Sequence, residues 1–301
     1  MGTIRISSVL DTPSMRRYRS ASLGEIQMQN PINKRLSLLA LLVANKAFAF
    51  QHSPPVATHS RHLNSVSKVA AKNSPITVIL VHGAFADGSS WSHVIPQLES
   101  SGYNVIAVQN PMTSFADDAA TTKRVIEAQT GPVILVGHSY GGAVITASAL
   151  GMANVRALVY VAAFAPDSGE VIGPMLEKYP SKLGASLVPD TAGFLTIARE
   201  KFKEAFAADV PDLEREILAA TQKPIASAIF AQQFTTPAWK SIPSWYMVAT
   251  EDNAINPDLE RMYAKRMNAK TTEVKSSHVP FISHPGLVVK LINDAISGTT
   301  K

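Results

Sequence analysis

The strongest constraint on the fold is an apolar run that ends in a serine flanked by glycines. Residues 132–136 are typical of a buried strand and lead directly into Gly137-x-Ser139-x-Gly141, and small residues at helical spacing begin at Ala143. So sharp a turn strains the backbone of the serine, and it leaves room only for glycine two positions before and after it. The pattern predicts a strand–turn–helix elbow with Ser139 as nucleophile; a glycine-rich turn without catalytic function is the alternative.

A serine hydroxyl needs a base to take its proton and a third group to orient that base. Two histidines follow the elbow in the chain. His278 comes just after a predicted strand at residues 272–276, from where a base can reach the nucleophile. His284 lies beside Pro285, before a predicted last helix from Gly286 to Ile296, and is expected to be an exposed helix-start residue. His278 is therefore the predicted base.

The predicted acid follows another strand. The apolar run at residues 245–250 opens into Glu251-Asp252, between the serine and the histidine, as the chain order that accompanies this elbow requires. Adjacent side chains point in different directions, so only one of the two carboxylates is expected to face His278. We expect that residue to be Asp252 and Glu251 to be a solvated loop charge. Asp167 is the reserve acid, or else an ordinary turn residue.

Acyl transfer also needs hydrogen-bond donors for the oxyanion of the tetrahedral intermediate. The first predicted strand, residues 75–81, ends in a loop that begins at His82. This loop and the residue after the nucleophile supply backbone N–H groups in such sites, so the oxyanion hole is placed at Tyr140 and at Ala84 or Phe85. His82 comes too early in the chain to be the base. It is expected to brace the loop by hydrogen bonding to backbone, with catalysis as the alternative.

These motifs together resemble the α/β-hydrolase superfamily, and more narrowly small bacterial esterases related to the plant methylesterase and hydroxynitrile lyase group. The resemblance covers residues 75–298 and rests on Val81-His82-Gly83-Ala84 with Gly88 and Trp91, the elbow at 137–142, Asp252, and Ser277-His278. It implies the α/β-hydrolase fold and a serine enzyme without a cofactor. Lyases of the group use a further hydroxyl in the oxyanion loop and a lysine near the catalytic histidine. Here Ala84 and Phe85, and Val279 and Pro280, stand at those places, which weakens the lyase interpretation.

The rest of the pattern alternates strands with helices. Strands are predicted near residues 75–81, 103–108, 132–136, 155–162, 244–249 and 272–276, and helices from Ser90 to Ser100 and from the N-cap Ser114 to Gln129. The alternation predicts an α/β domain with a mainly parallel sheet of about six strands and helices on both faces. A chain of 301 residues with 46% hydrophobic content suffices for one large core.

Residues 166–242 form a long insertion before the acid-bearing strand, where the fold needs only a crossover. A structureless loop of that length is improbable, and helix-like segments lie at Gly193 to Ala207 and Asp212 to Ala220. We expect a helical cap over the active site. Its apolar residues, which either line a pocket or form the cap's own core, are Met175, Leu176, Phe194, Phe230 and Phe234. Aromatic residues beside the catalytic loops are expected to bind the substrate, namely Phe85, Trp91, Tyr140, Phe164 and Phe281.

The first 49 residues are typical of a secretory leader. Lys34-Arg35 precede a short apolar run at 36–44, and Ala47-Phe48-Ala49 is a small-x-small cleavage site. We expect a signal peptide at about 28–49, with Met28 as a possible true start, and a periplasmic or secreted protein. An organelle-targeted protein is one alternative, because Arg16, Arg17 and Arg19 lie in a serine-rich, acid-poor stretch, and a cytoplasmic protein is another. The apolar run at 36–44 is too short to span a membrane. It also precedes the cleavage site, so we expect no stable membrane anchor after the leader is removed. Residues 50–74 are a predicted flexible linker.

The net charge of +5 belongs to that leader. Residues 1–49 carry seven Lys and Arg against two acids, whereas residues 50–301 carry 21 of each. The charge therefore predicts no nucleic-acid surface. The chain has no cysteine and hence no disulfide. His59 and His62 in the linker are expected to be incidental rather than metal ligands, and neither a metal nor a cofactor is expected.

These residues predict a serine hydrolase that cleaves small carboxylic esters through an acyl-enzyme. In it Ser139 attacks, His278 shuttles the proton and Asp252 holds the imidazole tautomer. The alternatives are cofactor-free lyase or perhydrolase chemistry on the same triad, or a non-catalytic ligand-binding protein with this fold. The expected partner is a small-molecule ester; the sequence carries no readable code for its acyl and alcohol groups or for the oligomeric state.

Overall fold

The computed structural model describes residues 75–299. A six-stranded sheet with the order β2-β1-β3-β4-β8-β9 forms its centre, and all the neighbouring strands are parallel. The strands are β1 (Thr77–Val81), β2 (Asn104–Val108), β3 (Val133–Ser139), β4 (Val155–Ala163), β8 (Ser244–Ala249) and β9 (Lys270–Val274). The predicted parallel sheet of six strands is confirmed, and each predicted strand lies within a few residues of the observed one.

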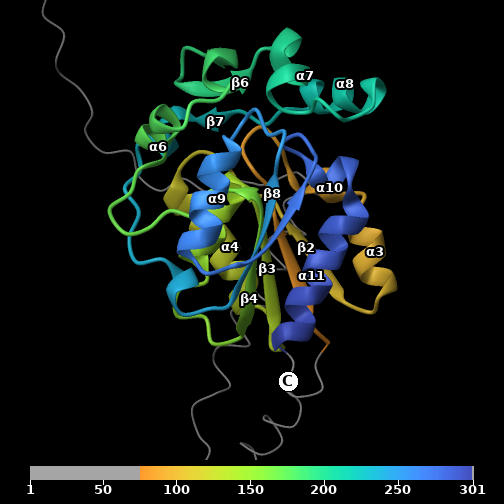
Figure 1. Cartoon of the computed structure of the whole chain (residues 1–301). Coiled ribbons are helices and arrows are strands. Elements are labelled where there is room, and N and C mark those ends of the chain that lie inside the picture. The colour runs from red at the N-terminus through yellow and green to blue at the C-terminus, as the bar shows by residue number, and fades with distance from the viewer. Residues whose placement is uncertain (1–74, 300–301) are drawn as a thin grey trace, which may run out of the picture. The chain divides into compact units, whose positions relative to one another are not determined.

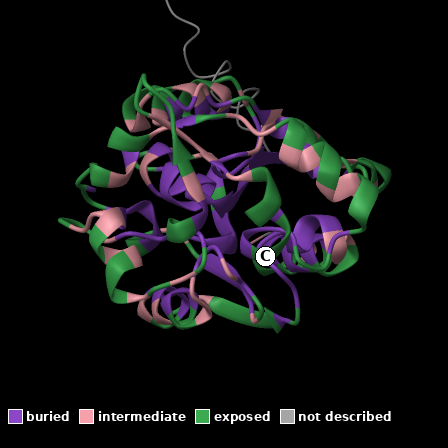
Figure 2. Ribbon diagram, turned by 90° about the horizontal axis from the view of Figure 1, so that it is seen from above, coloured by how far each residue is buried: buried purple, intermediate pink, exposed green. Residues whose placement is uncertain are grey.

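Helices cover both faces of this sheet (Figure 1). The helices of the main domain are η1 (Gly88–Trp91), α3 (Ile95–Ser100), α4 (Phe115–Glu127), α5 (Tyr140–Ser148), α9 (Pro257–Arg266), α10 (Pro280–Ser283) and α11 (Pro285–Thr299). Helices α3 and α11 lie on one face, and α4 and α9 lie on the other. The central strands β1, β3 and β8 are buried along their whole length, as expected for parallel strands covered on both sides. Figure 2 shows the buried residues gathered at this centre, with exposed residues around them.

Local sequence explains where the first helices begin. Ser114 caps α4 as predicted, because its hydroxyl accepts a hydrogen bond from the Asp117 N–H at 3.1 Å. The single helix expected from Ser90 to Ser100 is wrong: the segment forms the short 3-10 helix η1 and then α3. Pro96 sits in the first turn of α3. Proline lacks the N–H that a helix interior needs, so the helix starts beside it and does not run through it.

The insertion between β4 and β8 contains helices, as expected of the cap, and also a small antiparallel sheet that the sequence did not predict. Its elements are α6 (Ile172–Lys178), η2 (Gly184–Ser186), β5 (Leu187–Pro189), β6 (Phe194–Ile197), η3 (Arg199–Lys201), α7 (Phe202–Ala205), α8 (Asp212–Ala220), β7 (Ile225–Ala226), η4 (Ser227–Ala231) and η5 (Ala238–Lys240). Strand β6 pairs with both β5 and β7. The insertion lies above one end of the main sheet (Figure 1).

The predicted helix from Gly193 to Ala207 is right only in its second half, which forms η3 and α7, because a turn starts strand β6 in its first half. Gly193 has a φ of 83°, a conformation in which glycine pays no steric penalty. The Asp190 carboxylate accepts hydrogen bonds from the N–H groups of Ala192 at 2.8 Å and Phe194 at 2.9 Å. These contacts close a turn that aligns β6 with β5. The helix predicted at Asp212 to Ala220 is confirmed as α8.

Some expectations concern other parts of the chain. The leader at 1–49, the start at Met28, the linker at 50–74, and His59 and His62 lie outside the described residues. Within residues 75–299, no helix is both long and apolar enough to cross a membrane.

Candidate active site

Ser139 stands at the junction of β3 and α5, as the elbow motif predicts. Its φ is 52° and its ψ is −124°, a conformation that a non-glycine residue keeps only when the surrounding structure imposes it. The spacing of the glycines has a steric reason. A Cβ added at Gly137 would lie 2.6 Å from the Gly141 carbonyl oxygen, so the turn cannot close around a larger residue. The predicted elbow geometry is therefore present, with the serine at its apex.

The structure brings Asp252 and His278 together in the core. The His278 Nδ1 lies 2.5 Å from Asp252 Oδ2, and the side chains are 1% and 0% exposed. The other carboxylate oxygen accepts hydrogen bonds from the N–H groups of Ala254 at 2.6 Å and Ile255 at 2.9 Å. Three donors thus fix the orientation of the carboxylate. Because Asp252 accepts, Nδ1 carries the proton, and Nε2 of a neutral His278 is left as a proton acceptor.

The other candidate acids have other partners. Glu251 is exposed and lies 3.5 Å from the Lys275 ammonium, as expected of a solvated loop charge. Asp167 forms an ion pair of 2.5 Å with Lys240 in η5. The chain order and the observed contact therefore favour the same acid, Asp252.

Two buried histidines brace the loops around the serine. The His82 Nε2 accepts a hydrogen bond from the Asn110 N–H at 3.1 Å, so its Nδ1 donates to the Gly83 carbonyl at 2.9 Å. Burial lowers the pKa of His82 to about 4, and the ring is neutral at neutral pH. This is the bracing interaction that the sequence predicts for His82.

His138, which precedes the nucleophile, was not identified by sequence reasoning. Its Nε2 lies 2.9 Å from the His278 carbonyl oxygen; a carbonyl only accepts, so His138 carries its proton on Nε2. Burial holds the pKa of His138 well below its usual value. Its Nδ1 has no hydrogen-bond partner among the described residues. A neutral His138 therefore ties the base-bearing loop to the elbow.

The predicted oxyanion loop packs directly against the nucleophile. A Cβ added at Gly83 would lie 2.6 Å from the Ser139 Cβ. Ala84 and Phe85 follow in a turn, and Phe85 has a φ of 62°. This loop is close enough to place backbone N–H groups beside the serine. The oxyanion role of Ala84, Phe85 and Tyr140 stays a prediction.

A buried carboxyl that sequence reasoning missed holds the side chain of Tyr140. The Tyr140 hydroxyl donates to Asp118 Oδ2 at 2.7 Å, and the Met112 N–H donates to Asp118 Oδ1 at 2.8 Å. Burial raises the pKa of Asp118, and these two hydrogen bonds oppose the rise. The Met112 carbonyl in turn accepts from the Ala226 N–H of β7 at 2.9 Å. The network therefore connects the residue after the nucleophile to the insertion.

All five aromatic residues predicted to bind substrate are buried. Their exposed fractions are 0–3%: Phe85, Trp91, Tyr140, Phe164 and Phe281. The Phe281 ring packs against both Trp91, at 4.6 Å between centroids, and His138, at 4.5 Å. This places Trp91 and Phe281 in the packing beneath the elbow. Contact of the five residues with a substrate stays a prediction.

The insertion covers the histidine with an aromatic ring that the sequence did not point to. Phe206, which follows α7, meets the His278 ring edge to face at 4.9 Å, and it lies 6.3 Å from the Phe85 ring. The apolar ring thus packs against one side of the imidazole, whose side chain is 1% exposed. The only available signal was the position of Phe206 in a long insertion, which gives no information on its contacts.

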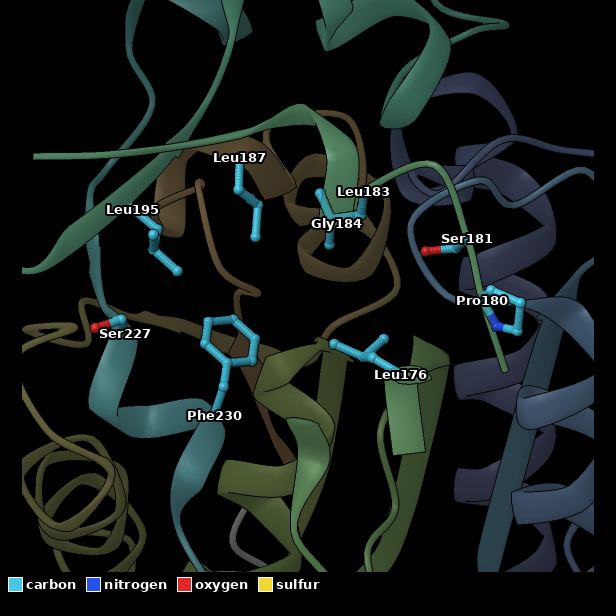
Figure 3. Close-up of a pocket in the computed structure, with 9 residues that line it drawn as sticks. All are labelled: Leu176, Pro180, Ser181, Leu183, Gly184, Leu187, Leu195, Ser227 and Phe230. Carbon is cyan, nitrogen blue, oxygen red and sulfur yellow. The ribbon is translucent and has the colours of Figure 1, made fainter. Parts of the chain in front are cut away.

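A cavity of about 390 Å³ lies within the insertion. It is lined by Leu176, Pro180, Ser181, Leu183, Gly184, Leu187, Leu195, Ser227 and Phe230. Figure 3 shows Leu187 and Leu195 facing Leu176 and Phe230 across it. Of the cap residues expected to line a pocket, Leu176 and Phe230 do so. Among these described lining residues none is charged, and the only polar side chains are the two serine hydroxyls. The cavity thus suits an uncharged apolar group.

A metal centre is not evident in the described part of the chain. Within residues 75–299, no group of three or more His, Cys, Asp or Glu side chains is arranged to hold a metal ion.

Comparison with known proteins identifies the family. The model of the alpha/beta hydrolase family matches residues 78–291. Polyneuridine aldehyde esterase of Rauvolfia serpentina is 27% identical over 256 residues, covering 72% of this chain and 94% of that protein. Alpha-hydroxynitrile lyase of Arabidopsis thaliana is 26% identical over 238 residues, covering 69% and 92%. The solved pyrethroid hydrolase of Sphingobium faniae JZ-2 is 23% identical with a TM-score of 0.66, covering 74% of this chain and 98% of that chain, and this likeness shows the fold. The chain therefore belongs to the α/β-hydrolase family and is related to plant methylesterases, hydroxynitrile lyase and polyneuridine aldehyde esterase.

Proposed function

We propose that this protein is a serine esterase that cleaves small uncharged carboxylic esters through an acyl-enzyme. One observation carries the proposal: a buried Asp252–His278 pair at 2.5 Å lies in the same core as a serine held at φ 52° at the end of a parallel strand. Acyl transfer needs a general base with a fixed tautomer and a serine nucleophile held in the strained turn between strand and helix.

The geometry supports a two-step reaction. The Ser139 Oγ attacks the ester carbonyl carbon while the His278 Nε2 takes its proton, and Asp252 stabilises the imidazolium that forms. The carbonyl oxygen becomes an oxyanion that accepts hydrogen bonds from the backbone N–H groups of Tyr140 and of Ala84 or Phe85. His278 then gives its proton to the leaving alcohol, and a water molecule, activated in the same way, releases the acid.

The cavity in the insertion supports an apolar substrate group. At about 390 Å³ it lies at the lower end of the range for small-molecule pockets. A carboxylate or an ammonium group placed there would lose its hydration without gaining an ionic partner from the lining residues. Relatives of this chain carry names that refer to ester cleavage, such as methylesterase and pyrethroid hydrolase. Both observations favour neutral esters with one compact apolar group.

The experiment is hydrolysis of p-nitrophenyl esters by the wild type, Ser139→Ala and a control, Ser92→Ala, whose side chain is exposed. Ser139→Ala is expected to lose about four or more decades of turnover, because no acyl-enzyme forms. Ser92→Ala is expected to retain full turnover. Near wild-type turnover in Ser139→Ala, with an unchanged circular dichroism spectrum, would show that another residue is the nucleophile.

Lyase chemistry on the same triad is the competing proposal, because alpha-hydroxynitrile lyase is a relative. The two residues after His278 are Val279 and Pro280, which are both buried. Neither has a charged side chain, so neither provides a cation for a departing cyanide. Cyanohydrin cleavage faster than ester hydrolysis by the purified protein would favour the lyase. Peracid formation from acetate and hydrogen peroxide is the corresponding assay for a perhydrolase.

A further inference from the structure

The insertion holds the loops that carry both the acid and the base. On the acid side, the Asn253 carbonyl accepts from the Lys182 N–H at 2.9 Å, and the Asn253 amide donates to the Glu204 carbonyl at 3.0 Å. The Ser181 hydroxyl donates to the Ala254 carbonyl at 2.9 Å. Each of these bonds joins a residue of the insertion to the turn that follows Asp252. The insertion is thus a structural support for the site as well as a cover.

Near the base, one carboxylate of the insertion accepts two hydrogen bonds from Ser277, the residue before His278. Asp209, between α7 and α8, accepts a hydrogen bond from the Ser277 N–H through Oδ2 at 3.1 Å, and another from the Ser277 hydroxyl through Oδ1. Ser277 is 3% exposed. Because the carboxylate accepts hydrogen bonds from both the N–H and the hydroxyl of Ser277, it fixes the backbone and the side chain of Ser277. The peptide unit that leads into His278 is therefore held from the insertion.

Asp209 is ionised at neutral pH. Partial burial raises the pKa of Asp209, but hydrogen bonds from the side chain and backbone of Ser277, together with smaller contributions from the Ser283 and Ser276 hydroxyls, bring it below its usual value. The His284 Nδ1 lies 3.8 Å from Asp209 Oδ2, a contact that is an ion pair only when His284 is protonated. Hydrogen bonds to a charged acceptor are the stronger kind. The contact with Ser277 thus has the strength needed to position a loop.

A second contact from the same segment reaches the imidazole itself. Phe206, three residues before Asp209, packs edge to face on the His278 ring at 4.9 Å between centroids. The His138 Nε2, in strand β3 of the main sheet, donates a hydrogen bond to the His278 carbonyl oxygen at 2.9 Å. The backbone on the N-terminal side of His278, its carbonyl and its ring are therefore each restrained by a different group.

We propose that Asp209 is a positioning residue that aligns the His278 imidazole for proton transfer by clamping Ser277 to the insertion. The inference rests on the esterase function proposed above. It adds that the insertion contributes to the chemical step and does not only bind substrate. Loss of the clamp lets the loop of His278 move, so proton transfer slows. The cavity proposed above to hold the substrate is not lined by Asp209, so it is expected to keep its shape.

The test compares Asp209→Ala and Asp209→Asn with the control Glu216→Gln, a substitution at an exposed carboxylate of α8 in the same insertion. We expect Asp209→Ala to lower kcat about tenfold to a hundredfold, the range for losing hydrogen bonds to a charged group, with KM within about twofold. Asp209→Asn should recover part of the loss, because its amide oxygen still accepts from the Ser277 N–H. Glu216→Gln should match the wild type.

A proton NMR measurement separates positioning from general damage. The Nδ1 proton between His278 and Asp252 is expected to give a low-field resonance in the wild type and in Glu216→Gln, and to broaden or shift in Asp209→Ala. If Asp209→Ala does not fold, Ser277→Ala removes one of the two bonds from the other side, and it is expected to lower kcat with KM unchanged.

Two results would overturn the proposal. One is an unchanged kcat and KM in Asp209→Ala or, if that variant does not fold, in Ser277→Ala. The other is an unchanged kcat with a raised KM, which would assign Asp209 to substrate binding alone. Ser139→Ala is measured in the same series. An inactive Ser139→Ala beside a fully active Asp209→Ala refutes only the positioning role, whereas an active Ser139→Ala refutes the proposed function itself.

Discussion

Asp252→Asn is the substitution whose effect follows most directly from the geometry. Asparagine has the size of aspartate, and its amide oxygen can still accept the N–H groups of Ala254 and Ile255 that now reach Oδ1 at 2.6 and 2.9 Å. Its NH₂ group then takes the place of Oδ2 and faces the His278 Nδ1. Two donors cannot bond, so the imidazole moves its proton to Nε2, and the atom that should accept the Ser139 proton is blocked.

The size of the effect follows from this loss of the base. Mutating the acid of such a triad to its amide costs about three to four decades of kcat, which corresponds to about 4 to 5.5 kcal/mol of transition-state stabilisation. Substrate binding is expected to change little, because the Asp252 side chain is 0% exposed and does not line the apolar cavity in the insertion. The loss should therefore appear in kcat, with a KM close to that of the wild type.

The assay is steady-state hydrolysis of a p-nitrophenyl ester by Asp252→Asn, Glu251→Gln and Asp167→Asn. Glu251→Gln is the matched control, because Glu251 is the adjacent carboxylate and it pairs with Lys275 at the surface. It should cost little. Asp167→Asn should also cost little, since its carboxylate pairs with Lys240. A larger loss in Glu251→Gln than in Asp252→Asn, or a large loss in Asp167→Asn alone, would refute the reasoning and move the acid.

Three further predictions concern stability, specificity and export. Glu260 is fully buried, and burial followed by repulsion from Asp252 raises its pKa well above the usual 4.5. The folded state therefore holds a proton that the unfolded state releases above pH 4.5, so the free energy of unfolding falls as the pH rises toward the folded pKa. In urea unfolding, Glu260→Gln should become more stable relative to the wild type over that pH range. A difference between the two proteins that does not depend on pH would contradict this. Short or aromatic p-nitrophenyl esters should be preferred because the cavity holds about 390 Å³, and activity that rises steadily to lipid-length acyl chains would contradict it. Export with cleavage after Ala49 should give a mature chain that starts Phe50-Gln51-His52, whereas recovery only of cytosolic protein that retains residues 36–44 would refute export.

The elbow and the acid–base pair could be predicted because short-range sequence encodes them. Gly137 and Gly141 stand where the turn has no space for a Cβ, so the constraint is visible as a pattern. Asp252 and His278 each follow a predicted strand end, and parallel strands bring such ends to one edge of the sheet. Chain order then selects between the candidate residues.

The supporting contacts could not be predicted because they join distant segments. Asp209 lies 68 positions from Ser277, and Asp118 lies 22 positions from Tyr140. No local pattern indicates that a loop carboxylate will face a particular backbone N–H. The strand β6 was mistaken for a helix for a related reason, since its conformation depends on pairing with β5 and β7.

Covalent labelling of Ser139 tests the central claim most directly. The wild type would be treated with a fluorophosphonate that reacts with activated serines, and the adduct would be located by intact mass and peptide mapping. The account predicts one adduct, on Ser139, that is absent in Ser139→Ala and forms much more slowly in Asp252→Asn. An adduct on another residue, or no adduct in a preparation that still hydrolyses esters, would contradict it.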